Sequence, residues 1–143
     1  MASETATPID VQSRTRTGAW QAGIAGGLAG GIAFGALMTL TMQPVIEMAI
    51  PGLYGLEPSL VTGWGIHLVN SIIFGLVFAG VLQMSGFENR FDSPVAVTAA
   101  GLTYGVVLWL VLASVVMPAW VGVMTEMAPP VPDWSAQSLV GHA

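Results

Sequence analysis

Charged residues divide this chain into three long uncharged runs, which are 17–46, 58–87 and 93–125. A helix needs about 20 predominantly apolar residues to cross the roughly 30 Å hydrocarbon core of a bilayer, and each run exceeds that length. Three such helices in 143 residues leave no polar shell that could cover them in water. The pattern predicts an all-α integral membrane helical bundle, with three full transmembrane helices near 18–43, 59–84 and 94–118.

Prolines mark the expected helix boundaries. Pro44 and Pro118 come late in the first and third runs, where each removes a backbone hydrogen bond and should bend or end its helix. The aromatic and proline-rich segments that follow are typical of short turns at the membrane interface. The second helix should begin at Pro58-Ser59, because proline fits the first turn of a helix and serine can cap it.

Two stretches of the chain read like copies of each other. The first contains Gly31-Ile32-Ala33-Phe34-Gly35, then Glu47-Met48-Ala49, then His67. The second contains Gly101-Leu102-Thr103-Tyr104-Gly105, then Glu126-Met127-Ala128, then His142. The repetition favours an internal duplication of a helical hairpin, with 17–84 as the first hairpin and 95–143 as the second. The alternative is chance similarity between glycine-rich apolar helices.

The second copy stops partway through its last element. Residues 133–143 would form about 16 Å of helix, which is half a crossing, so we expect an incomplete second hairpin with a truncated fourth helix. Three explanations stay open: the remainder of a fourth helix is missing from this chain, the segment lies in the interface, or a partner covers it. The first is the one we favour.

Glycines at a spacing of four predict close helix packing. Gly23, Gly27, Gly31 and Gly35 share one face of the first helix, and Gly101 and Gly105 repeat the pattern in the third. Missing side chains let another membrane helix approach closely. The second helix offers small residues for this contact at Ser71, Gly75 and Ala79.

The few charges predict an orientation. All three basic residues, Arg14, Arg16 and Arg90, lie in a polar tail, 1–16, or in the loop 85–94. Under the positive-inside rule, the tail and this loop face the cytoplasm, and the acidic segments 43–58 and 126–135 face outward. We therefore expect a multi-pass protein of the cell membrane with a cytoplasmic amino terminus.

Composition removes several classes of function. The chain has no cysteine, which excludes disulfides, thiolate chemistry and iron–sulfur ligation by thiolate. A pI near 4.5 argues against nucleic acid as a partner. Neither a phosphate-binding loop nor a Gly-x-Ser-x-Gly or His-Glu-x-x-His motif occurs, so no enzymatic activity is expected.

The two histidines are the candidate cofactor-binding residues. His67 and His142 follow matching prolines at similar expected depth, and Glu47 and Glu126 could close over them. Two imidazoles with two carboxylates suit zinc, iron or manganese, and two opposed imidazoles could ligate haem. The competing interpretations are structural hydrogen bonding of each histidine, which is the commoner role, and proton or quinone handling. Which cofactor binds, if any, is left open.

Glycine-rich hairpins with a histidine in each second helix resemble small prokaryotic membrane proteins, haloarchaeal ones in particular. The resemblance begins near Gly18, implies a four-helix architecture, and brings no established activity with it. Two hypotheses of function result. The chain is either an accessory or structural subunit of a larger membrane complex, such as a respiratory complex, or a metal- or haem-binding membrane protein. Its expected partners are the lipid bilayer and other membrane subunits or further copies of itself.

Overall fold

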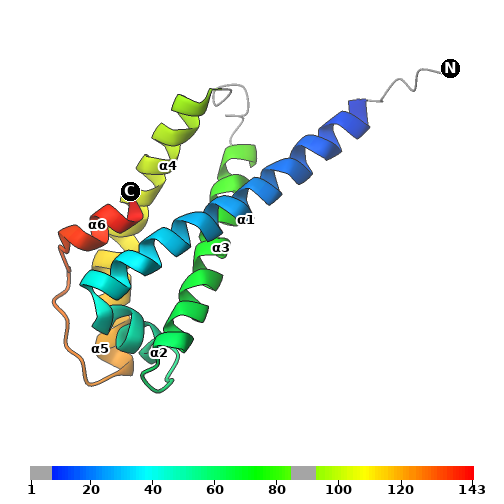
Figure 1. Ribbon diagram of the computed structural model, residues 1–143. Helices are drawn as coiled ribbons and strands as arrows, with labels where there is room; N and C mark the ends of the chain where they lie inside the picture. The colour runs from blue at the N-terminus through cyan, green and yellow to red at the C-terminus, as the bar shows by residue number, and fades with distance from the viewer. Residues whose placement is uncertain (1–7, 85–92) are drawn as a thin grey trace.

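The computed structural model describes residues 8–84 and 93–143, with side chains from Gly18 onward. In that part of the chain every regular element is helical, as the sequence predicts (Figure 1). The elements, in which η marks a π-helical segment, are α1 (Pro8–Thr41), η1 (Val45–Ala49), α2 (Ile50–Gly52), α3 (Leu60–Met84), α4 (Pro94–Leu108), η3 (Trp109–Val116), α5 (Met117–Met124) and α6 (Ala136–His142). The start of the predicted tail and most of the predicted loop 85–94 fall outside the described residues.

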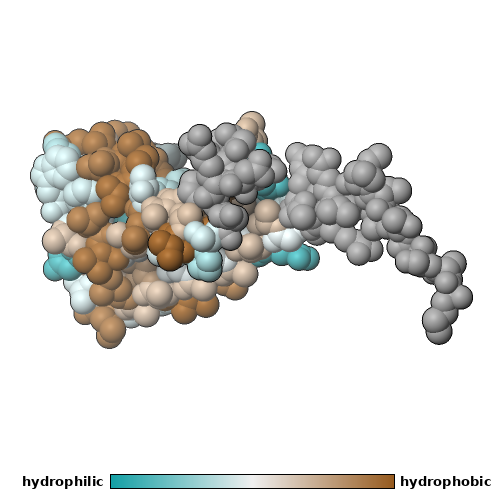
Figure 2. Space-filling model, turned by 90° about the horizontal axis from the view of Figure 1, so that it is seen from above, coloured by the Kyte–Doolittle hydropathy of each residue, from teal (hydrophilic) through white to brown (hydrophobic). Residues whose placement is uncertain are grey.

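Three helical stretches are long and apolar enough to cross a membrane, which are Gly18–Thr41, Leu60–Met84 and Pro94–Met124. Their outer faces carry large apolar side chains: Leu40 and Val61 are each 84% exposed, and Val123 is 83% exposed. Apolar residues cover much of the face seen in Figure 2. Side chains of this kind are expected where a helix faces lipid.

The first hairpin is α1 packed against α3 along the glycine row of α1. A side chain at Gly23 would lie 2.7 Å from the carbonyl oxygen of Gly75, and one at Gly27 would meet the Ser71 carbonyl. Gly31 lies equally close to the Ser71 side chain. Because none of these positions has a Cβ, the two backbones approach to a distance that other residues would prevent.

The first helix begins earlier than the sequence pattern predicts. Helical backbone starts at Pro8 rather than near residue 17, so the expected tail 1–16 is helical over its described part. Proline suits the first turn of a helix, and neither glycine nor proline interrupts residues 9–17.

The third helix does not end at Pro118, so the predicted end at residue 118 was wrong, while the alternative that this proline bends the helix stays a prediction. The chain stays helical from Pro94 through η3 to Met124, with Pro118 at the start of α5. Proline leaves the carbonyl four residues earlier without its helical donor. Here that carbonyl belongs to Ser114, and the backbone N–H of Asp133 donates to it at 2.8 Å. The interruption is therefore repaired from outside the helix.

The same arrangement occurs in the first hairpin. Pro51 follows the π-helical segment η1, and the carbonyl that it leaves free, that of Glu47, accepts from the backbone N–H of Ser59 at 2.9 Å. We call these two contacts the carbonyl latches. Each one fixes the chain just before a helix, α3 in the first hairpin and α6 in the second. Ser59 also caps α3 as predicted, accepting from the N–H of Thr62.

The second hairpin packs more loosely against the first. The Tyr104 hydroxyl of α4 donates to the carbonyl of Phe74 on α3 at 3.0 Å, and its ring lies 5.1 Å from that of Phe78. The short helix α6 lies between α1 and α4 (Figure 1), where the His142 carbonyl occupies the space that a side chain on Gly105 would need. These few contacts leave an open groove between the hairpins.

Candidate functional site: a groove with two histidines

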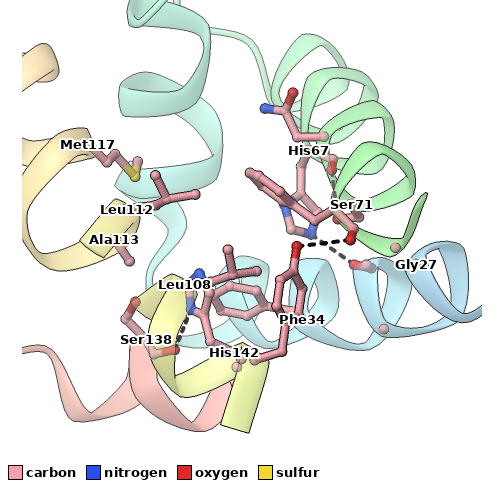
Figure 3. Close-up of a pocket in the computed structure, with 18 of the residues that line it drawn as sticks. Gly27, Phe34, His67, Ser71, Leu108, Leu112, Ala113, Met117, Ser138 and His142 are labelled. Atoms are coloured by element: carbon pink, nitrogen blue, oxygen red, sulfur yellow. Dashed lines mark hydrogen bonds between the residues drawn. The ribbon is translucent and has the colours of Figure 1, made fainter. Parts of the chain in front are cut away.

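The groove has a volume of about 880 Å³ and runs between the first hairpin and the elements α4, η3 and α6. Its walls are mainly apolar side chains and glycine backbone, and both histidines of the chain lie on them. A cavity of this size, apolar with a few polar groups, is typical of a ligand-binding site. Figure 3 shows the middle of the groove, with His67 reaching in from α3 and His142 from α6.

His67 is held in one orientation by α1. Its side chain is 9% exposed, and its Nε2 lies 2.9 Å from the backbone carbonyl oxygen of Gly31. A carbonyl only accepts hydrogen bonds, so Nε2 must carry the proton and donate. The rings of Phe34 and Trp64 contact the imidazole edge to face, with centroids 5.6 and 6.3 Å away. The glycine at position 31 brings α1 close enough for this bond to form.

His142 is held by its own helix. Its Nδ1 lies 2.8 Å from the carbonyl oxygen of Ser138, one turn earlier in α6, and must donate for the same reason (Figure 3). The Phe34 ring contacts this imidazole as well, at a centroid distance of 4.8 Å. Ser135 caps α6 by accepting from the N–H of Ser138, which fixes the start of the helix that carries the histidine.

Phe34 therefore stands between the two imidazoles. Their centroids can be no farther apart than 5.6 Å plus 4.8 Å, the two distances to the Phe34 ring. The matched positions of His67 and His142 in the sequence thus correspond to a shared location in the fold. An aromatic ring, rather than a carboxylate, occupies the space between them.

The free ring nitrogens of the histidines are acceptors. With Nε2 of His67 and Nδ1 of His142 protonated, a neutral imidazole keeps a lone pair on the opposite nitrogen. Two nearby hydroxyls are already committed, because that of Ser71 donates to the carbonyl of His67 and that of Tyr104 to the carbonyl of Phe74. The Ser138 hydroxyl also lines the groove, so the middle of the groove offers two imidazole acceptors and one serine hydroxyl.

The two carboxylates proposed as ligands lie elsewhere. Glu47 is in η1, where its carboxylate accepts from the Gln43 side chain at 2.8 Å. Glu126 is exposed in the segment that follows α5. Among the described residues, no three histidine, aspartate or glutamate side chains come together in a group that could hold a metal ion. The structure brings together His67 and His142 alone.

The glycines proposed for helix packing divide into two groups. A Cβ built at Gly35 would lie 2.5 Å from the nearest atom of the Trp64 ring. Gly35 therefore faces α3, as Gly23, Gly27 and Gly31 do. In α4, Gly105 faces α6. A side chain at Gly101 would meet nothing within 4 Å, and this residue lines the groove instead.

Sequence reasoning missed the aromatic residues of the site. Phe34 and Tyr104 occupy the same place in the repeated Gly-x-x-aromatic-Gly motif, and both line the groove. The Gly-x-x-aromatic-Gly pattern could have indicated them. In both stretches it places one large aromatic side chain on a helix face that otherwise carries small residues. The internal duplication itself stays a prediction.

The chain matches no protein-family model, no curated protein and no solved structure. The resemblance to haloarchaeal membrane proteins therefore stays a prediction.

Proposed function

We propose that this chain is an integral membrane protein that acts as an accessory subunit, docking on a helix of a larger membrane complex through the outer face of α1. The observation that carries the proposal is a second row of small residues on α1, on the face opposite α3. We call this row the outer seam. Its members, all exposed, are Ala22, Gly26, Ala29, Ala33 and Ala36.

The spacing of the outer seam alternates between four and three residues, which keeps its members on one face of a helix. A side chain built at Gly26 would meet nothing within 4 Å, whereas the glycines facing α3 are all in close contact. Small side chains give no advantage in packing against lipid. They do favour packing against another helix, because the two helix backbones can then approach closely. Small residues allow α1 and α3 to pack closely in the first hairpin. The outer seam supports a docking role for the same reason.

The experiment is a size comparison in mild detergent. Protein tagged and purified from its own membranes should migrate with larger subunits, and the double variant Ala29→Leu, Ala33→Leu should migrate alone. Gly65→Leu is the matched control, since Gly65 is on α3 and a side chain there would meet nothing within 4 Å. Unchanged migration of the seam variant would rule out the outer seam as the docking face.

The proposal includes an orientation, with the amino terminus and the loop 85–94 in the cytoplasm. Single cysteines at Ser13, Glu57 and Asp92 give a direct test in a chain that has none of its own. In intact cells an impermeant thiol reagent should label only position 57. Labelling of position 92 from outside would reverse the orientation.

A second candidate function is metal or haem binding by His67 and His142. It is favoured by the bonds to Gly31 and Ser138, because metal-bound histidines commonly donate their other ring N–H to a carbonyl. The fit is incomplete, since a structural metal site takes about four ligands and this one offers two. A haem iron between the imidazoles would require Phe34 to leave. Visible absorbance or stoichiometric metal in the purified protein, lost in His67→Ala, would support this candidate.

A further inference from the structure

We propose that the groove binds an apolar molecule with a hydroxyl head, such as a long-chain alcohol or phenol, whose hydroxyl donates one hydrogen bond to a free imidazole nitrogen. The two available acceptors are Nδ1 of His67 and Nε2 of His142. This inference concerns the groove between the hairpins. Ala22 and Gly26 of the outer seam also line the groove, so docking is tested at Ala29 and Ala33, which do not. Unlike a metal ion, such a ligand does not require a third or fourth protein group in addition to the two histidines.

The choice of a hydroxyl follows from the hydrogen bonds already made. Each histidine has one nitrogen tied to a backbone carbonyl, so in the neutral ring the other can only accept. A ketone, ester or ether would place acceptor against acceptor, and an ammonium group would bring a charge to a place where charge is costly. A hydroxyl is a neutral donor and satisfies both conditions.

The choice of an apolar tail follows from the rest of the groove. From Phe34 the groove continues along α1 past Gly30, and along α4 past Gly101. Side chains built at these two glycines would meet nothing within 4 Å, so the space beside them is open. A chain of methylene groups fits a channel lined by glycine backbone and apolar side chains, since it has no polar atoms to satisfy there.

His67 supplies the observation that points to a ligand rather than to packing alone. Its side chain is only 9% exposed and lines the groove, and Nδ1 makes no hydrogen bond within the described part of the chain. This nitrogen is not among the fully enclosed polar atoms, so it is open to the groove, where a donor on a bound molecule can satisfy it. His142 presents a second such nitrogen from across the Phe34 ring.

The test uses the whole chain in lipid nanodiscs with a matched pair of probes, para-nonylphenol and its methyl ether para-nonylanisole. The two differ only in the donor hydrogen and its replacement by methyl. We expect the phenol to shift the imidazole nitrogen NMR resonances of the histidine that accepts its hydrogen bond, and to bind about tenfold more tightly than the ether, the usual value of one good hydrogen bond. Equal affinity for the two probes would show that the groove selects only for apolarity, and the proposal would be wrong.

Two variants locate the effect. His142→Phe and His67→Phe keep a ring of similar size but remove an acceptor, so the variant that replaces the bonded histidine should lower the preference for the phenol over the ether. Gly65→Ala, two residues from His67 on the outer face of α3, should leave it unchanged. A phenol preference that survives in both histidine variants would overturn the assignment of these acceptors. Zinc that shifts both imidazoles when the phenol shifts neither would favour the metal site instead.

Discussion

The two hairpins of this protein use glycine in the same sequence motif and reach different packing. In the first, the row through Gly27 and Gly31 lies against α3 along most of a membrane crossing. In the second, Gly105 meets the end of α6 while Gly101, one turn away, faces the groove. The difference shows that a glycine row permits close approach without causing it. How much of the glycine row is in contact with another helix depends on the length of that helix, which is long in α3 and short in α6.

The consequence for function is a division of labour between the hairpins. The first is a closed unit whose α3 holds His67 rigidly against the carbonyl of Gly31. The second carries its histidine on α6, a helix of seven residues that begins at the Ser135 cap and contacts α1, α4 and η3. Because α6 is so short, we expect the wall that it forms to be less firmly held than the first. A ligand between the two walls would bind to a preorganised first wall, which lowers the cost of ordering, while the second wall could adjust to its size.

The largest expected effect is a break in the first hairpin. Gly27→Leu should destabilise the protein by about 3 kcal/mol or prevent folding, because the new side chain would meet the carbonyl of Ser71 and force the helices apart. Gly26→Leu is the control one position away, since its side chain would meet nothing within 4 Å. Thermal unfolding in detergent, followed by circular dichroism, measures both. Equal stability of the two variants would mean that the row does not face α3.

A smaller effect is expected from the corresponding change in the second hairpin. Gly105→Leu should displace α6, because the carbonyl of His142 occupies the space the side chain would take, while α1 and α3 stay together. Gly101→Leu should leave α6 in place and fill part of the groove. Proteolysis near residues 136–142 should accelerate in the first variant only. Acceleration in both would show that α6 depends on the whole row.

Two tryptophans sharpen the comparison, because each donates its indole N–H within one hairpin. Trp64 donates to the hydroxyl of Thr39 at 3.1 Å, and Trp109 donates to the carbonyl of Ser135 at 3.3 Å. Replacing either by phenylalanine removes one bond worth about 1 kcal/mol. We expect Trp64→Phe to lower the melting temperature and Trp109→Phe mainly to loosen α6. The reverse pattern would place the rigid wall in the second hairpin.

The sequence predicted the helices better than their interruptions. Uncharged length and glycine spacing indicated three apolar helices and the face of α1 that meets α3, because both depend on local chemistry. The fate of Pro118 was not predictable from local pattern, since the donor that repairs the helix is Asp133, fifteen residues later. The histidines were found by their repeated positions. The position of Phe34 between them was missed, because it depends on how three helices, α1, α3 and α6, pack against one another.

The smallest expected effect concerns the carbonyl latches, where the two hairpins are most alike. Pro118→Ala restores a backbone N–H that can bond to the Ser114 carbonyl within the helix, in competition with Asp133. Losing the Asp133 bond should speed exchange of its amide hydrogen about fivefold, the equivalent of one hydrogen bond of ~1 kcal/mol. Pro51→Ala makes the matching change at Glu47 and Ser59.

We expect the second substitution to have the weaker result. The hydroxyl of Ser59 also caps α3, so the chain there stays fixed when its own N–H loses the Glu47 carbonyl. Asp133 is instead separated from the cap of α6 at Ser135 by one residue, Trp134, and the bond to the Ser114 carbonyl is its main anchor on the helix. Mass spectrometry of deuterium uptake in the two segments compares them directly. Faster exchange at Ser59 than at Asp133 would contradict the view that the second hairpin is the more weakly held.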